Sequence, residues 1–131
     1  MKSLLNYHML REQPCKQVPG EPPRRWIFDD YFDLIVWCEP DGNPMGFQLC
    51  YDKQHREHAL TWTRKGGFSH AGVDGGESGP LSNCTPILVP GGPFPAETVT
   101  RQFLWRSAEI DPQVRELVLK KIDEYATCCK A

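Results

Sequence analysis

Residues 26–38 read WIFDDYFDLIVWC and are the stretch of the chain richest in aromatic and β-branched side chains. Such side chains favour extended strands, so the sequence predicts a β-strand here. Between residues 31 and 37, apolar side chains occupy odd-numbered and even-numbered positions alike, so both faces of the strand are apolar. A strand with two apolar faces usually has a neighbour on each side, which predicts a central place in a sheet.

Three more strands are predicted downstream of this one. The sequence PDGNP at residues 40–44 is typical of a hairpin turn, because Asp-Gly readily adopts the tight backbone of such a turn. Residues 46–53 (GFQLCYDK) and 58–64 (HALTWTR) then alternate apolar and polar side chains, the pattern of antiparallel strands with one buried face. The last strand is predicted for ILV at residues 87–89, whose flanking prolines suit the edge of a sheet.

The connection between the third and the fourth predicted strand is long and rich in glycine. It includes residues 65–80, KGGFSHAGVDGGESGP, in which six of sixteen residues are glycine. A connection of this length can return the chain to the free side of the first strand, so we expect the strand order 4-1-2-3 of a Greek key. Whether residues 65–83 form a lid over a ligand or a slack connection stays open, because long connections serve both purposes.

The last third of the sequence predicts two helices. The first covers residues 96–107, and its apolar side is formed by Val99, Phe103 and Leu104. The second has Asp111 as its N-cap and Pro112 as its first residue. Its apolar stripe consists of Val114, Leu117, Val118, Ile122, Tyr125, Ala126 and Cys129. We therefore expect an α+β fold in which both helices pack on one face of an antiparallel sheet of three to four strands.

One domain accounts for most of the chain. The 131 residues are enough to bury a sizeable core without disulfide support. Residues 1–24 contain four prolines and little periodicity, so we expect an N-terminal arm that is partly disordered, with a short helix near residues 4–11. Residues 25–131 are expected to form a single α+β domain.

Composition and charge argue against several classes of partner. Fifteen lysine and arginine residues stand against seventeen aspartate and glutamate residues, a formal net charge of −2, so we expect no nucleic-acid partner. No segment approaches the roughly 20 apolar residues that a membrane span requires, and residues 1–10 lack the cleavage site of a secretory signal. We therefore expect a cytoplasmic protein with no membrane partner and with its six cysteines reduced.

A candidate site follows from the pairing that the hairpin turns suggest. The predicted register sets Asp33 opposite Tyr51 in the first hairpin and Lys53 opposite His58 in the second. These four side chains would then meet at one end of the sheet, where a carboxylate, a phenol, an ammonium and an imidazole lie together. A slip of one residue in the first hairpin would move Asp33 to the other face of the sheet.

Two further candidates lie in the glycine-rich stretch. A lid bearing His70 and Asp74 would deliver both groups to a pocket. Together with Lys53 at the end of the sheet, they are the candidate ligand-binding residues. Cys84, in the late part of the long connection between the third and fourth predicted strands, is interpreted as an inert thiol, because a free cysteine often behaves as a small apolar side chain.

Other familiar chemistries find little support in the sequence. Asp29 and Asp33 share a face of the predicted strand but stand about 13 Å apart, too far for two acids to act on one bond. No Cys-x-x-Cys pair occurs and no glycine motif for phosphate binding is matched. We therefore expect neither a metal site nor a cofactor.

Two classes of function remain. The favoured class is a non-enzymatic binding or interaction module that holds a partner protein or a small ligand with the open sheet face and the glycine-rich stretch. The alternative is a small hydrolase-type enzyme in which His58 or His70 acts as general base and Asp33 orients that base. Tyr51 is the remaining catalytic candidate, and residues 65–83 would close as a lid. No motif names a reaction, so the sequence leaves open whether the protein is an enzyme.

Overall fold

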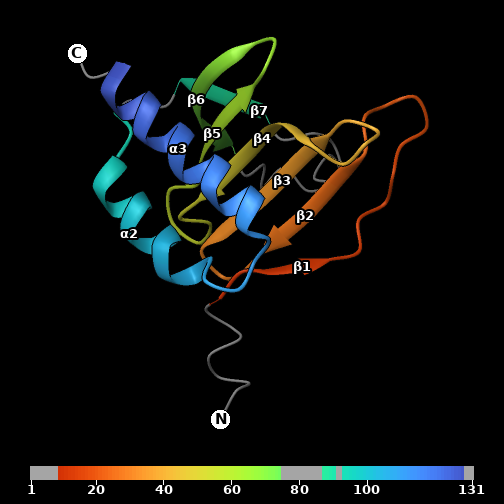
Figure 1. Cartoon of the computed structure of the whole chain (residues 1–131). Helices are drawn as coiled ribbons and strands as arrows, with labels where there is room; N and C mark the ends of the chain where they lie inside the picture. The colour runs from red at the N-terminus through yellow and green to blue at the C-terminus, as the bar shows by residue number, and fades with distance from the viewer. Residues whose placement is uncertain (1–8, 75–86, 91–92, 129–131) are drawn as a thin grey trace.

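The described part of the chain forms one antiparallel β-sheet with two helices packed on one of its faces (Figure 1). This computed structural model describes residues 9–74, 87–90 and 93–128. The predicted α+β class, the antiparallel sheet and the two C-terminal helices are confirmed. Within the described ranges, no helix is both long enough and apolar enough to cross a membrane.

Seven strands make up the sheet in the described residues, and each pairs with its neighbours along the chain. The strands are β1 (Arg11–Gln13), β2 (Arg24–Phe28), β3 (Phe32–Cys38), β4 (Pro44–Tyr51), β5 (His58–Thr63), β6 (Gly67–Asp74) and β7 (Ile87–Pro90). The helices are α2 (Ala96–Arg106) and α3 (Pro112–Cys128). The order β1-β2-β3-β4-β5-β6-β7 is a meander, so the predicted count of three to four strands and the predicted order 4-1-2-3 are wrong.

The first error comes from residues 26–38, which form parts of two strands rather than one. Asp29 lies between β2 and β3, and its carboxylate accepts hydrogen bonds from the backbone N–H groups of Tyr31 (2.8 Å) and Phe32 (2.7 Å). Aspartate commonly stabilises a turn in this way, so the chain reverses here and β2 pairs with β3. The central place of β3 is confirmed, but its second neighbour is β2 and not β7.

The second error comes from the glycine-rich stretch, part of which is strand β6. In this strand Phe68 and His70 point to the helix side of the sheet, where both contact the ring of Tyr125 in α3. β6 begins at Gly67, whose φ of +74° is rarely adopted by other residues. β7 pairs with β6 at the edge of the sheet. Residues 75–83 of the predicted lid lie outside the described residues.

The core lies between the sheet and the helices. Its buried members are Leu10, Ile27, Phe32, Leu34, Val36, Cys38, Phe47, Leu49, Tyr51, Leu60, Val99, Phe103, Val114, Val118 and Ile122. Phe32 of β3 meets Phe103 of α2 edge to face, with 5.5 Å between the ring centroids. Leu104, predicted on the buried side of its helix, is instead 45% exposed, because the buried stripe of α2 runs through Val99, Phe103 and Arg106.

Helix α3 begins as the sequence predicts. Pro112 is its first residue, and the carboxylate of Asp111 accepts a hydrogen bond from the N–H of Gln113 at 2.9 Å. The predicted apolar stripe faces the core through Val114, Val118 and Ile122. Cys129, the last member of that stripe, lies outside the described residues.

The N-terminal residues contribute an edge strand. Leu10 is 2% exposed, and its N–H donates to the carbonyl of Arg106 at 2.9 Å. This hydrogen bond joins the residue before β1 to the last residue of α2. Beyond β1, the side-chain amide of Gln17 bonds both the N–H (2.9 Å) and the carbonyl (2.8 Å) of Arg24, as a neighbouring strand would. Part of the segment expected as an arm therefore belongs to the sheet. Residues 4–8 of the predicted short helix lie outside the described residues.

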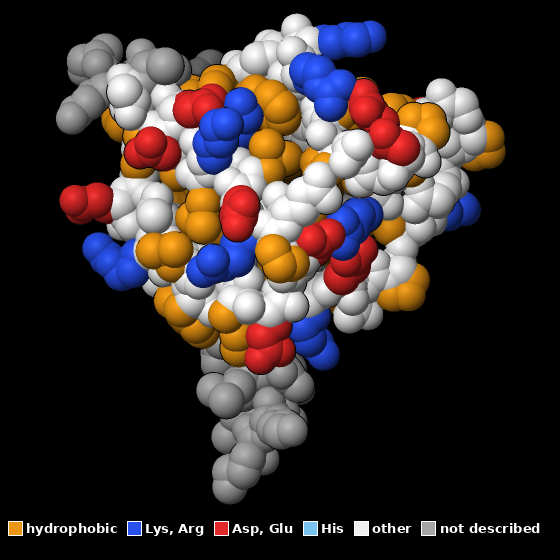
Figure 2. Space-filling view, in the orientation of Figure 1, with side chains coloured by type: hydrophobic (Ala, Val, Ile, Leu, Met, Phe, Trp, Pro, Cys, Tyr) orange, Lys and Arg blue, Asp and Glu red, His pale blue; other side chains and the backbone are white. Residues whose placement is uncertain are grey.

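The helix side of the molecule carries charges of both signs. Figure 2 shows lysine and arginine side chains interspersed with aspartate and glutamate, with apolar side chains between them. The large apolar side chains that are exposed in the described residues are Leu104 (45%) and Trp105 (46%) of α2.

Candidate functional site

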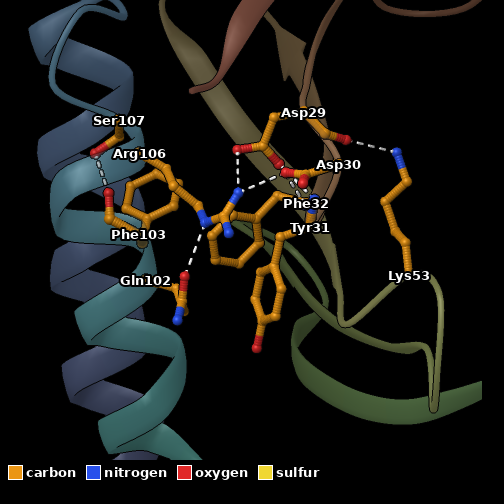
Figure 3. A network of polar contacts seen from close by, with 9 residues as sticks. All are labelled: Asp29, Asp30, Tyr31, Phe32, Lys53, Gln102, Phe103, Arg106 and Ser107. Carbon is orange, nitrogen blue, oxygen red and sulfur yellow. Dashed lines mark hydrogen bonds and ion pairs between the residues drawn. The ribbon is translucent and has the colours of Figure 1, made fainter. Parts of the chain in front are cut away.

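A buried ion network fixes helix α2 to the turn between β2 and β3 (Figure 3). Nη1 of Arg106 donates to Oδ2 of Asp29 at 3.0 Å and to Oδ1 of Asp30 at 2.7 Å. The Asp29 side chain is fully buried and that of Arg106 is 10% exposed, so this ion pair is shielded from solvent. The guanidinium carbon also lies 5.0 Å from the ring centroid of Tyr31. The two adjacent acids thus serve to dock a helix.

Three of the four candidate catalytic residues meet on the helix side of the sheet. Tyr51, His58 and His70 come from the neighbouring strands β4, β5 and β6, and we call them the histidine cluster. Tyr51 lies directly opposite His58, with 5.8 Å between the ring centroids. The centroids of His58 and His70 are 5.4 Å apart, and Tyr51 Oη lies 2.6 Å from Nε2 of His70.

The surroundings of the histidine cluster are mainly aromatic. Phe94 and Tyr125 pack against His70 with centroid distances of 5.3 and 6.1 Å. Burial is the main cause that raises the pKa of Tyr51, so its hydroxyl stays protonated at neutral pH. Nδ1 of His58 is 2.7 Å from the carbonyl oxygen of Arg56 and donates its proton to it, because a carbonyl only accepts. The cluster is therefore a packed and hydrogen-bonded group.

Asp33 does not join the histidine cluster. It lies opposite Cys50, and Phe32 takes the predicted place opposite Tyr51. The register differs by one residue from the prediction because of a β-bulge near the turn: Cys38 pairs with Pro44 but Trp37 pairs with Gly46. Asp33 therefore faces the other side of the sheet, where its carboxylate accepts a hydrogen bond from Nε1 of Trp26.

The remaining candidates lie apart from the cluster. Lys53 is in the turn between β4 and β5 rather than opposite His58, and its ammonium donates to the carbonyl of Asp29 at 2.9 Å (Figure 3). Asp74 is the last residue of β6, and its side chain is not among the described groups. In the described residues, no three histidine, cysteine, aspartate or glutamate side chains are grouped so that they could hold a metal ion.

The face of the sheet opposite the helices is the second notable surface. We call it the open face, and its members include Trp26, Phe28, Asp33, Ile35, Trp37, Gln48, Cys50 and Thr61. Trp26 stacks on Phe28 with 4.4 Å between the ring centroids and 15° between the planes. Ile35 and Trp37 lie beside this pair on β3, and all four side chains are only partly buried.

Sequence reasoning did not select these apolar residues as site residues. The signal was present, because residues 31–37 are apolar at alternate positions on both faces. The open sheet face was predicted as the binding surface, but none of these residues was assigned to it. Once the helices occupy one face, the second set of apolar side chains stays outside the core that the helices cover.

One end of the open face holds two acids and a thiol. Burial, then the negative charges of Glu57 and Asp33, raises the pKa of Cys50 to about 12, so this thiol is a poor nucleophile. The pKa of Glu57 is also raised, first by burial and then by the charge of Asp33. We call Asp33, Cys50 and Glu57 the acidic end of the open face.

Comparisons with protein-family models, with curated proteins and with solved structures find no match for this chain.

Proposed function

We propose that this protein is a non-enzymatic binding module that holds a segment of a partner protein against the open face of its sheet. One observation carries the proposal: Trp26, Phe28, Ile35 and Trp37 form a partly exposed apolar surface on the face that the two described helices leave free. A sheet face that only meets water usually carries polar side chains, and a contiguous apolar surface is typical of an interaction site.

The arrangement of this surface suits a protein segment. Its apolar side chains are spread along β2 and β3, and tryptophan and phenylalanine are enriched where protein interfaces gain most of their energy. The ring of Trp26 is held in place by Phe28 on one side and by the hydrogen bond to Asp33. A side chain that is already ordered loses little entropy when a partner binds.

The hydrolase alternative receives less support. A histidine base is normally oriented by a carboxylate, and Asp33, the residue expected in that role, lies on the opposite face of the sheet from His58 and His70. His58 is bonded to a backbone carbonyl, and His70 is bonded to the phenol of Tyr51. We therefore place binding before catalysis.

The proposal is tested by selecting random peptides, displayed on phage, against the purified protein. Bound peptides are then measured by fluorescence anisotropy with Trp37→Thr, which removes an open-face ring while keeping a residue that favours strands. The matched control is Trp105→Gln on α2, another tryptophan whose ring is 46% exposed but lies away from the sheet face.

We expect selected peptides to bind the wild type and the control alike, and to lose about tenfold in affinity with Trp37→Thr, the loss typical of an interface hot spot. Circular dichroism verifies that both variants are folded. Failure to select any peptide, or a loss confined to Trp105→Gln, contradicts the proposal.

A further inference from the structure

We infer that the partner segment presents a cationic side chain, arginine first, to the acidic end of the open face. This inference rests on the proposed function and names the chemistry of the partner. Asp33 and Glu57 are close enough for the charge of one to act on the other, and Asp33 lies beside the partly buried aromatic pair Trp26 and Phe28.

The acidic end carries two carboxylates, with the ammonium of Lys53 nearby. Asp33 receives a hydrogen bond from a neutral indole, and it forms no ion pair with another described residue. Its charge makes ionisation of Glu57 less favourable, so the two carboxylates repel one another. A cation that binds between them removes this repulsion, whereas an anion meets both charges. The acidic end therefore favours a cationic partner group.

The aromatic side chains next to the acids already hold one cation. The ammonium of Lys53 lies 5.3 Å from the ring centroid of Phe28, and it acts favourably on the charge of Glu57. Lys53 is committed to the carbonyl of Asp29, to which it donates at 2.9 Å. Tryptophan attracts cations more strongly than phenylalanine does, so the partly exposed ring of Trp26 is a suitable place for a second cation.

Arginine fits this combination best among the cationic side chains. Its planar guanidinium stacks on an aromatic face and donates two parallel hydrogen bonds to a carboxylate. The indole of Trp26 and the carboxylate of Asp33 are joined by a hydrogen bond, so a stacking surface and an acceptor lie side by side. The compact ammonium of lysine can pair with the carboxylate, but it has no planar group that could stack on the ring.

The experiment uses the tightest peptide from the selection and two synthetic versions of it, with each arginine replaced by citrulline, its neutral isostere, or by lysine. Fluorescence anisotropy compares their affinities for the wild type and for the double variant Asp33→Asn/Glu57→Gln. This variant keeps both shapes, and the amide oxygen that it introduces in place of the Asp33 carboxylate can still accept from the indole of Trp26. The matched control is Glu116→Gln/Asp123→Asn, which removes two acids from α3.

We expect the arginine peptide to bind the wild type about fivefold more tightly than the citrulline peptide, with lysine between them, as for one exposed cation over an aromatic ring. The double variant should make this difference smaller, because only the aromatic ring of Trp26 then remains for the cation, and the α3 control should keep it in full. Selected peptides without a cationic residue, or equal binding of the arginine and citrulline peptides, overturn the inference while leaving the proposed function intact. Failure of all peptides to bind overturns both.

Discussion

At the scale of single residues, Glu57 is a group whose ionisation opposes folding. A carboxyl with a pKa raised by folding, as burial and Asp33 raise that of Glu57, binds its proton more tightly in the folded chain. The contribution of the protonated Glu57 carboxyl to the free energy of unfolding is therefore fully present below the unfolded pKa of about 4.3, and it is lost as pH rises through the folded pKa. We predict that Glu57→Gln is more stable than the wild type at neutral pH, by less than about 1 kcal/mol because solvent reaches the side chain.

Urea denaturation at acid and at neutral pH measures this difference. It should vanish at acid pH, where Glu57 of the wild type is protonated as it is in the unfolded chain. Glu116→Gln on α3 is the control and should follow the wild type at both pH values. A wild type more stable than Glu57→Gln at neutral pH contradicts the account of this residue.

The position of a side chain could be predicted from the sequence only where the face of the strand on which it lies could be predicted. The sequence suggested that Tyr51 and His58 lie together, and the structure also brings His70 to them. Asp33 was misplaced because one extra residue of β4 near the turn shifts the register, and a shift of one residue moves a side chain to the other face. A bulge of this kind depends on how the turn and the strands fit together, which the local sequence does not specify.

At the scale of elements, Arg106 joins α2 to the sheet. Its removal leaves the fully buried carboxylate of Asp29 without a countercharge. We predict that Arg106→Met, which keeps much of the side-chain volume, lowers the free energy of unfolding by about 3 kcal/mol. Urea denaturation at neutral pH gives this value. Arg101→Met, at an exposed position of the same helix, should change the free energy by less than about 0.5 kcal/mol.

The double variant Asp29→Asn/Arg106→Met separates the lost ion pair from the lost packing. Asparagine can still accept hydrogen bonds from the backbone N–H groups of Tyr31 and Phe32, so the turn between β2 and β3 keeps its bonds. The double variant should therefore be more stable than Arg106→Met alone. Equal effects of the Arg106 and Arg101 substitutions on stability speak against this role of Arg106.

Elements with strong local patterns were predictable, and elements decided by a single turn were not. Helix α3 follows from Asp111, Pro112 and the apolar stripe, and these features act locally. The division of residues 26–38 depends on two hydrogen bonds to Asp29, a residue that looks in the sequence like an ordinary acid within a strand. Strand β6 was hidden by its glycines, because glycine content is typical of loops.

At the scale of the whole molecule, the meander gives the sheet two unlike faces. The two helices cover one face of the sheet (Figure 1). The open face presents aromatic side chains from β2 and β3. The predicted Greek key would have set another strand beside β3 and changed which side chains meet on that face. The surface on which the proposed function rests therefore follows from the topology as much as from the residue types.

The four tryptophans of the chain allow the central claim to be tested directly. Trp26 and Trp37 lie on the open face, whereas Trp62 lies on the helix side, where Nζ of Lys121 is 4.3 Å from its ring centroid, and Trp105 lies on α2. Each indole N–H gives its own signal in a proton–nitrogen NMR spectrum of the labelled protein. Titration with the tightest selected peptide should shift the signals of Trp26 and Trp37 and leave those of Trp62 and Trp105 in place. Shifts confined to Trp62 or Trp105 would contradict the claim that the open face is the binding surface.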